Sequence, residues 1–139
     1  MGLINDDILR VLIKQKNLVL VGTVDPGGIP NISPRFVLDV INNEKLLFAD
    51  AFENKTFHNI ESWPKVAVAI VDRESLGGYQ LKGDAEIVTD APLVDRARIM
   101  LKELGINANP VRTWILNVKE IFSLIPHPKS RRPFVSAYT

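Results

Sequence analysis

Short apolar segments separated by strong turn signals constrain the fold of this chain more than any other feature. Residues 18–24 are apolar and rich in β-branched side chains, a composition that favours a β-strand. The sequence Asp-Pro-Gly-Gly at residues 25–28 follows at once and is typical of a tight turn. A second strand is expected over residues 30–40, so these segments together predict an antiparallel hairpin.

The rest of the chain continues this alternation of strands and turns, with helices inserted between them. Four further strands are expected over residues 45–50, 66–71, 79–88 and 113–124. Helices are expected over residues 6–16, 54–62 and 91–104, and residues that can cap a helix precede the first and the third of them. Six strands with short flanking helices favour a small antiparallel barrel or an α+β sandwich. No linker divides residues 1–139, so a single domain is expected.

Composition argues against several classes of partner and chemistry. The 139 residues carry 17 basic and 16 acidic side chains, a net charge of +1, so no nucleic-acid partner is expected. No apolar run is long enough to span a bilayer, and the first residues do not resemble a signal peptide. These features predict a cytoplasmic protein with no membrane partner. The lack of cysteine excludes disulfides, iron–sulfur clusters and thiolate nucleophiles.

The passage from the strand at residues 45–50 into the following helix carries the clearest chemical signal. Asn54, Lys55 and Thr56 lie in the first helical turn, where a lysine is unusual because the helix N-terminus already carries partial positive charge. Backbone amides, a hydroxyl and an ammonium gathered at one point suit an anion such as phosphate. A surface helix with a solvated lysine is the alternative interpretation.

A second cation stands in the strand expected over residues 30–40. Asn31, Ser33 and Arg35 share one face of that strand by the alternation of side chains, and bulky apolar residues occupy the other. A guanidinium offers planar, paired donors that match phosphate oxygens. The next strand leads directly into the helix that carries Lys55, so we expect the two cations to converge at one end of a barrel. An exposed hairpin with ordinary polar residues is the alternative.

The sequence contains few of the motifs that other kinds of catalytic or metal site require. No dinucleotide fingerprint, Walker loop, nucleophile elbow or pair of carboxylates is visible. The two histidines, His58 and His127, do not form a convincing metal site. No catalytic side chain is therefore assigned. If the chain performs redox chemistry, a bound cofactor must supply it.

The order of these features resembles the flavin-binding split-barrel proteins related to pyridoxamine 5′-phosphate oxidase. The likeness extends over residues 18–124 and depends on the motifs at residues 18–38, 54–60, 64–68 and 80–87, with Arg-Phe-Val-Leu at residues 35–38. The resemblance implies a six-stranded antiparallel split β-barrel that is mainly β with short flanking helices. It also implies a homodimer that holds FMN at the subunit interface.

The resemblance assigns cofactor-binding roles to particular residues. Basic groups at Arg35 and Lys55 are implied to bind the FMN phosphate, with help from Asn54 and Thr56. The residues implied to lie along the flavin are Phe36, Val37, Phe48 and Ala49, and a glutamine that faces the cofactor corresponds to Gln80.

The expected function is that of an FMN-binding oxidoreductase or electron carrier, with a small-molecule redox substrate or an electron-transfer partner. The vitamin B6 oxidases are longer, and Val40 stands where they carry a lysine, so the smaller FMN-binding members are the closer match. One alternative is a reductase that uses deazaflavin F420, whose longer anionic tail would favour Lys129 and Arg131. The other is a non-enzymatic module that binds haem, with His127 as a possible iron ligand, or that stores flavin.

Overall fold

The structure, a computed structural model, describes residues 3–52, 54–107, 112–126 and 135–136. Its helices are α1 (Asp6–Lys14), α2 (Lys55–Ser62) and α3 (Ala91–Glu103). Its strands are β1 (Leu18–Val24), β2 (Pro30–Phe36), β3 (Asp39–Ile41), β4 (Lys45–Asp50), β5 (Lys65–Asp72), β6 (Gly77–Val88), β7 (Arg112–Ser123) and β8 (Val135–Ser136).

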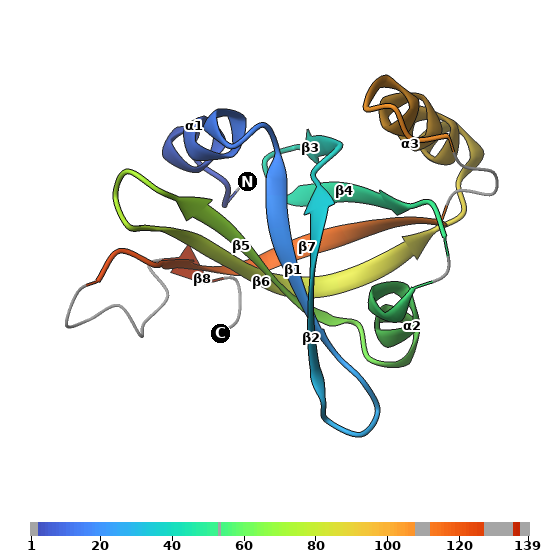
Figure 1. Cartoon of the computed structure of the whole chain (residues 1–139), viewed down its shortest axis with the longest axis horizontal. Helices are drawn as coiled ribbons and strands as arrows, with labels where there is room; N and C mark the ends of the chain where they lie inside the picture. The colour runs from blue at the N-terminus through green and yellow to red at the C-terminus, as the bar shows by residue number, and fades with distance from the viewer. Residues whose placement is uncertain (1–2, 53, 108–111, 127–134, 137–139) are drawn as a thin grey trace.

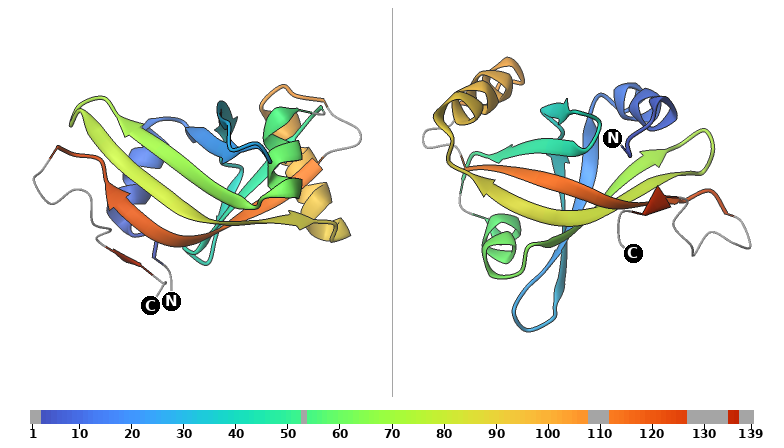
Figure 2. Two further views of the ribbon diagram at one scale, coloured as in Figure 1. Left: turned by 90° about the horizontal axis from the view of Figure 1, so that it is seen from below. Right: turned by 180° about the vertical axis from the view of Figure 1, so that it is seen from behind.

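The strands form one antiparallel sheet that curls into a half-barrel (Figure 1). Seven strands follow the order β2-β1-β5-β6-β7-β4-β3, and the short β8 pairs with β7 beyond the point where β4 begins. The helices flank this sheet, with α1 toward one end and α2 and α3 toward the other (Figure 2). The predicted class, a mainly β split barrel with short helices, is confirmed.

The strand predicted over residues 30–40 is broken in the structure, which is why the sheet path has seven strands rather than six. The Val37 amide donates to the Asn17 carbonyl at 2.8 Å, whereas the Leu38 amide donates to the Leu47 carbonyl at 2.9 Å. The chain thus leaves the β1 edge and joins the β4 edge within two residues. Val37 and Leu38 are both buried, in two different cores, so the alternation of a single strand cannot continue through them.

The main core fills the inside of the half-barrel. Val21, Val68 and Leu81, from the neighbouring strands β1, β5 and β6, are fully buried there. The apolar face of α1 covers this core with Ile8 and Leu12. Each buried side chain of this size contributes roughly 1.5–3 kcal/mol through removal from water, so this core is the main source of stability for the sheet.

A smaller core joins α3 to the outer side of β4 and β7. Leu47 and Ile115 pack there against Leu101 of α3. On the opposite side of β4, Phe48 stacks on Trp114 with ring centroids 4.4 Å apart. β4 is therefore buried on both faces, and α3 is held next to the point where β4 ends.

Polar side chains set the ends of the helices. Asn5, Asn54 and Asp90 each accept a hydrogen bond from an amide in the first turn of α1, α2 and α3, respectively. After α1, Lys16 and Asn17 adopt left-handed backbone conformations, which turn the chain into β1. None of the helices in the described ranges is long and apolar enough to cross a membrane.

An ion pair ties α1 to the β5–β6 hairpin. Lys14 Nζ lies 3.0 Å from Asp72 Oδ1 and 3.4 Å from Glu74 Oε2. The hydrogen bond from Lys14, with smaller contributions from Ser75 and the Glu74 amide, holds the pKa of Asp72 below its ordinary value. The same contact with Asp72 raises the pKa of Lys14. Each shift means that folding favours the charged form of the group.

We predict that Lys14→Met lowers the free energy of unfolding at pH 7 and that this loss shrinks in acid. Because the pKa of Asp72 is depressed in the folded chain, the stability from this pair is present above about pH 4, the ordinary aspartate value, and is lost as the pH falls further. Because the pKa of Lys14 is raised, the contribution is also lost as the pH rises above about 10.4. Urea unfolding at pH 7 and pH 3 measures the difference.

Lys102→Met is the matched control, because Lys102 occupies the last turn of α3 as Lys14 does in α1 and has no carboxylate partner among the described residues. A Lys14→Met loss that stays constant between pH 7 and pH 3 would show that Lys14 acts only through packing.

Candidate functional site

A cavity of about 500 Å³ opens beside the end of β4, bordered by the end of β2, the segment leading into α2, and α3. Its polar side chains come from Arg35, Asp50 and Asn54. Its apolar walls include Phe36, Ala49, Phe52, Leu101 and Ile106. A mostly apolar cavity of this size with a few polar groups at one side is the usual form of a small-molecule site.

A largely buried ion pair between Arg35 and Asp50 forms part of this cavity. Arg35 Nε donates to Asp50 Oδ1 at 2.6 Å, and Arg35 Nη1 donates to the Pro34 carbonyl at 2.7 Å. The side chain of Asp50 is 1% exposed and that of Arg35 is 19% exposed. Since β2 and β4 are not neighbours in the sheet, this pair connects two distant positions of the strand order.

The second oxygen of Asp50 is in a different situation. Oδ2 is buried and has no hydrogen-bond partner among the described residues. A buried carboxylate oxygen is normally hydrogen-bonded, because removing it from water without a partner is costly. This oxygen belongs to a residue that lines the cavity.

The N-terminus of α2 borders the same cavity through Asn54. Asn54 Oδ1 accepts from the Phe57 amide at 2.8 Å, and Asn54 Nδ2 donates to the Phe52 carbonyl at 2.8 Å. The first turn of α2, which is described throughout, contains no acidic residue. The partial positive charge of the helix N-terminus is therefore not offset within the helix itself.

Lys55 does not line this cavity. Its side chain is 60% exposed, and Nζ lies 3.4 Å from Asp25 Oδ2 in the turn between β1 and β2. The amide of Ile29 is the largest cause that holds the pKa of Asp25 below its ordinary value, with Lys55 and the Gly27 amide adding to it. Thus Arg35 and Lys55, which we expected to converge, each contact a different carboxylate.

Thr56 is buried and connects α2 to β2. Its hydroxyl shares a hydrogen bond of 2.6 Å with the Ser33 hydroxyl and accepts from Asn31 Nδ2 at 3.2 Å. One turn later, Asn59 Nδ2 donates to Thr23 Oγ1 at 3.0 Å. Thr56 therefore fixes the position of α2 on the barrel, and with it the position of the helix N-terminus.

The residues expected along a flavin separate into two groups. Phe36 and Ala49 line the cavity. Val37 and Phe48 direct their side chains into the main core, where they are 1% and 0% exposed. Only their backbone can therefore border a ligand in this arrangement.

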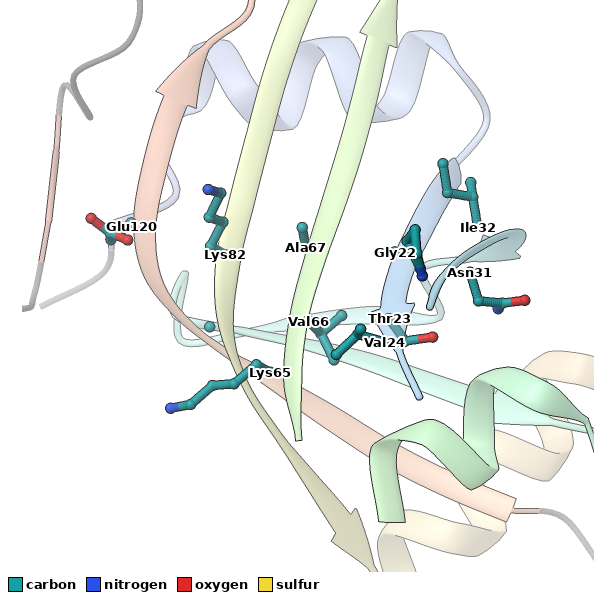
Figure 3. A pocket seen from close by; sticks show the side chains of 12 residues that line it. Gly22, Thr23, Val24, Asn31, Ile32, Lys65, Val66, Ala67, Lys82 and Glu120 are labelled. Atoms are coloured by element: carbon teal, nitrogen blue, oxygen red, sulfur yellow. The ribbon is translucent and has the colours of Figure 1, made fainter. Parts of the chain in front are cut away.

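A second, shallower hollow of about 390 Å³ lies on the outer face of the sheet. The strand register sets Ile32, Gly22, Ala67, Lys82 and Glu120 in one row across it, and Figure 3 shows them in this order. Glycine and alanine at the centre of the row leave the depression between larger side chains. Ile32 is 72% exposed at its rim.

Gln80 belongs to the adjacent row of this outer face. The register places it beside Ala69, with Leu20 and Phe122 in the same row. Gln80 does not line the cavity that contains Arg35. Within a single subunit, Gln80 therefore lies apart from the predicted residues that line the cavity.

Sequence reasoning missed Asp50, Leu101 and Ile106. Asp50 is an acid that directly follows the apolar residues 46–49. An acidic residue at the end of a buried strand was the sequence signal that could have identified it. For Leu101 and Ile106 no local signal existed, because their role depends on where α3 packs.

Comparison with known proteins places this fold in a family. A family model described as pyridoxamine 5′-phosphate oxidase matches residues 6–124. An uncharacterized protein of Methanocaldococcus jannaschii is 30% identical over 116 residues, which cover 82% of this chain and 77% of that protein. The chain belongs to the pyridoxamine 5′-phosphate oxidase family, as its motifs predicted.

Solved structures show the same fold. HupZ of Group A Streptococcus is 30% identical, with a TM-score of 0.75 over 88% of this chain and 95% of that one. A pyridoxamine 5′-phosphate oxidase-related, FMN-binding protein of Nostoc punctiforme is 11% identical, with a TM-score of 0.71 over 94% and 87%. An F420 reductase is 20% identical, with a TM-score of 0.56 over 75% and 87%. The last two likenesses concern the fold alone.

Proposed function

We propose that this chain binds FMN non-covalently and serves as an oxidoreductase or electron carrier, with the cytoplasm as its expected location. The observation that carries the proposal is the cavity itself, which has Arg35 and the α2 N-terminus among mostly apolar walls. An amphipathic ligand with an anionic end and a flat apolar end suits that distribution. Membership of the pyridoxamine 5′-phosphate oxidase family supports the choice of a flavin.

In this proposal the phosphate lies between Arg35 and the first amides of α2, next to Asn54. Arg35 is held by Asp50 through Nε, which fixes the orientation of its guanidinium before the ligand arrives. Lys55 joins the phosphate by leaving Asp25, a movement within reach of an exposed lysine with four rotatable bonds. Thr56 acts indirectly, because its contacts with β2 hold the helix in place.

The ring of the flavin would lie along the apolar part of the cavity. Phe36 and Ala49 form that wall, and the backbone next to Val37 and Phe48 continues it. When bound, FMN supplies hydride or single-electron transfer. The residues of this chain bind and orient it and exclude water, and no side chain is assigned as a catalytic acid or base.

Absorbance of the protein titrated with cofactor tests the proposal. We predict saturable binding of FMN, with shifted near-ultraviolet and blue flavin bands. The F420 reductase with the same fold makes deazaflavin F420 the second candidate, and haem is the third. Uptake of either in preference to FMN would refute the proposal. Lys129, Arg131 and His127, on which these alternatives would draw, lie outside the described residues.

We predict opposite effects for two changes at the Lys55–Asp25 contact. Lys55→Ala removes a cation from the phosphate and weakens FMN binding by roughly 1.5–3 kcal/mol at most, the range for a charge-assisted hydrogen bond. Asp25→Asn removes the competing carboxylate but keeps an oxygen for the turn amides, so FMN binding becomes tighter. Titration of both variants at low salt measures the two shifts. Unchanged FMN affinity in Lys55→Ala would remove Lys55 from the site.

We further propose that two copies associate through the outer face that carries the shallow hollow. Leu20 and Ile32 are 42% and 72% exposed there, beside small residues that allow close approach. Gln80 lies on the same face, so in a dimer it can reach the cofactor of the partner subunit although it does not reach its own cavity. Such a dimer would explain why Gln80, a predicted cofactor-binding residue, does not line the cavity of its own subunit.

We predict that Ile32→Glu converts a dimer into a monomer, because the change buries an unpaired carboxylate in the interface. Size-exclusion chromatography with light scattering measures the mass. Ile99→Glu is the matched control, since Ile99 is an isoleucine of α3 that is 59% exposed and lies away from this face. A wild-type chain that is already monomeric at high concentration would contradict the proposed interface.

A further inference from the structure

A third hollow, of about 180 Å³, lies where the C-terminal end of α3 meets the residues before β1 and the crossing from β2 to β3. Sites for drug-sized molecules have volumes of roughly 300–1,000 Å³, so a ligand of this hollow must be smaller than those. The lining is mostly apolar, with one charged side chain of each sign at its border, and it includes Lys16, Phe36, Val37, Leu38, Met100, Glu103 and Leu104.

The backbone that lines this hollow is fixed by hydrogen bonds within the chain. The Val37 amide donates to the Asn17 carbonyl at 2.8 Å, and the Leu38 amide donates to the Leu47 carbonyl at 2.9 Å. Asn17 Nδ2 in turn donates to the Val37 carbonyl at 3.1 Å. The hollow is therefore formed before any ligand binds, which lowers the cost of binding. Because both amides are occupied, a ligand must find its polar partners among the side chains.

Lys16 and Glu103 are the charged side chains available for this purpose, and both are exposed. They reach the hollow from different elements, Lys16 from the turn after α1 and Glu103 from the last turn of α3. Neither forms an ion pair with the other or with any further residue that the structure describes. A ligand with one charge is attracted by one of these groups and repelled by the other, whereas a ligand with both charges can pair twice.

We propose that this hollow binds a small zwitterion with an apolar chain, of the kind represented by free leucine. Its carboxylate pairs with Lys16, its ammonium pairs with Glu103, and its apolar chain is removed from water beside Leu38 and Met100. A methionine suits such a position, because its flexible thioether adapts to ligands of different shape. Phe36 also lines the larger cavity, so the two sites share one wall. The proposal does not depend on which cofactor, if any, occupies that cavity.

The test compares free leucine with three probes that each lack one feature. Removal of the amino group gives 4-methylpentanoate, removal of the carboxylate gives 3-methylbutylamine, and glycine keeps both charges without the apolar chain. Titrations of the ligand-free chain are followed by NMR through the amide signals of Val37 and Leu38, which line the hollow. Free leucine is expected to bind roughly tenfold or more tightly than the two singly charged probes, the lower end of the range for hydrogen bonds to charged groups. Glycine is expected to bind weakly as well, because it has no apolar chain to bury.

Two variants assign the charges of the ligand to the residues of the hollow. Glu103→Gln should abolish the preference for free leucine over 4-methylpentanoate, because the ammonium loses its partner. Lys16→Met should abolish the preference over 3-methylbutylamine, because the carboxylate loses its partner. Both positions are exposed, so neither change is expected to disturb folding.

Lys102→Met and Glu61→Gln are the matched controls for these titrations. Lys102 is next to Glu103 in α3 and Glu61 is an exposed acid of α2, and neither lines the hollow. Both controls should keep the wild-type preferences, which shows that a change in net charge does not by itself alter ligand discrimination.

Each other result of these titrations overturns the proposal. Equal binding of free leucine and the singly charged probes would show that the hollow selects only for apolar groups. A lack of saturable shifts at Val37 and Leu38 would show that the hollow binds no such ligand. Retained preferences in Lys16→Met and Glu103→Gln would place the recognition elsewhere. FMN titration of the same samples decides the proposed function separately, since either site can be occupied while the other is not.

Discussion

The ion pair between Arg35 and Asp50 is the interaction on which the candidate site depends. It joins β2, at one end of the strand order, to β4, close to the other end, where the half-barrel curls back on itself. The pair is nearly removed from water, so loss of either partner would leave a buried charge without compensation, which is strongly destabilising. The guanidinium is therefore held at a defined position in the cavity before any ligand binds.

The charges around the site are balanced in the ligand-free chain. Arg35 is paired with Asp50, and Lys55 is paired with Asp25. An anion that binds here must share Arg35 with the Asp50 carboxylate. To be paired with Lys55 as well, it must draw that lysine away from Asp25. The N-terminus of α2 has no such competitor within its own first turn.

The candidate site was predictable where its residues are neighbours in sequence or alternate along a strand. Arg35, Phe36, Ala49 and Asn54 all line the cavity, and each was expected from strand alternation or from the family motifs. The contact of Lys55 was not predictable, because a long exposed side chain chooses among partners that only folding brings near. The wall that α3 contributes was missed for a related reason, since a helix packs on a surface that the other elements create.

The sequence by itself determined which segments become strands and helices, because turn residues, helix caps and apolar alternation act over a few neighbouring positions. It also determined the family, through motifs that match those of known split barrels. Only the tertiary structure decided that the chain crosses from one sheet edge to the other at Val37 and Leu38, because burial in two separate cores overrides the local preference for a continuous strand. Likewise, only the folded chain brings the carboxylate of Asp50 against Arg35, because that contact joins strands that are far apart in the sheet.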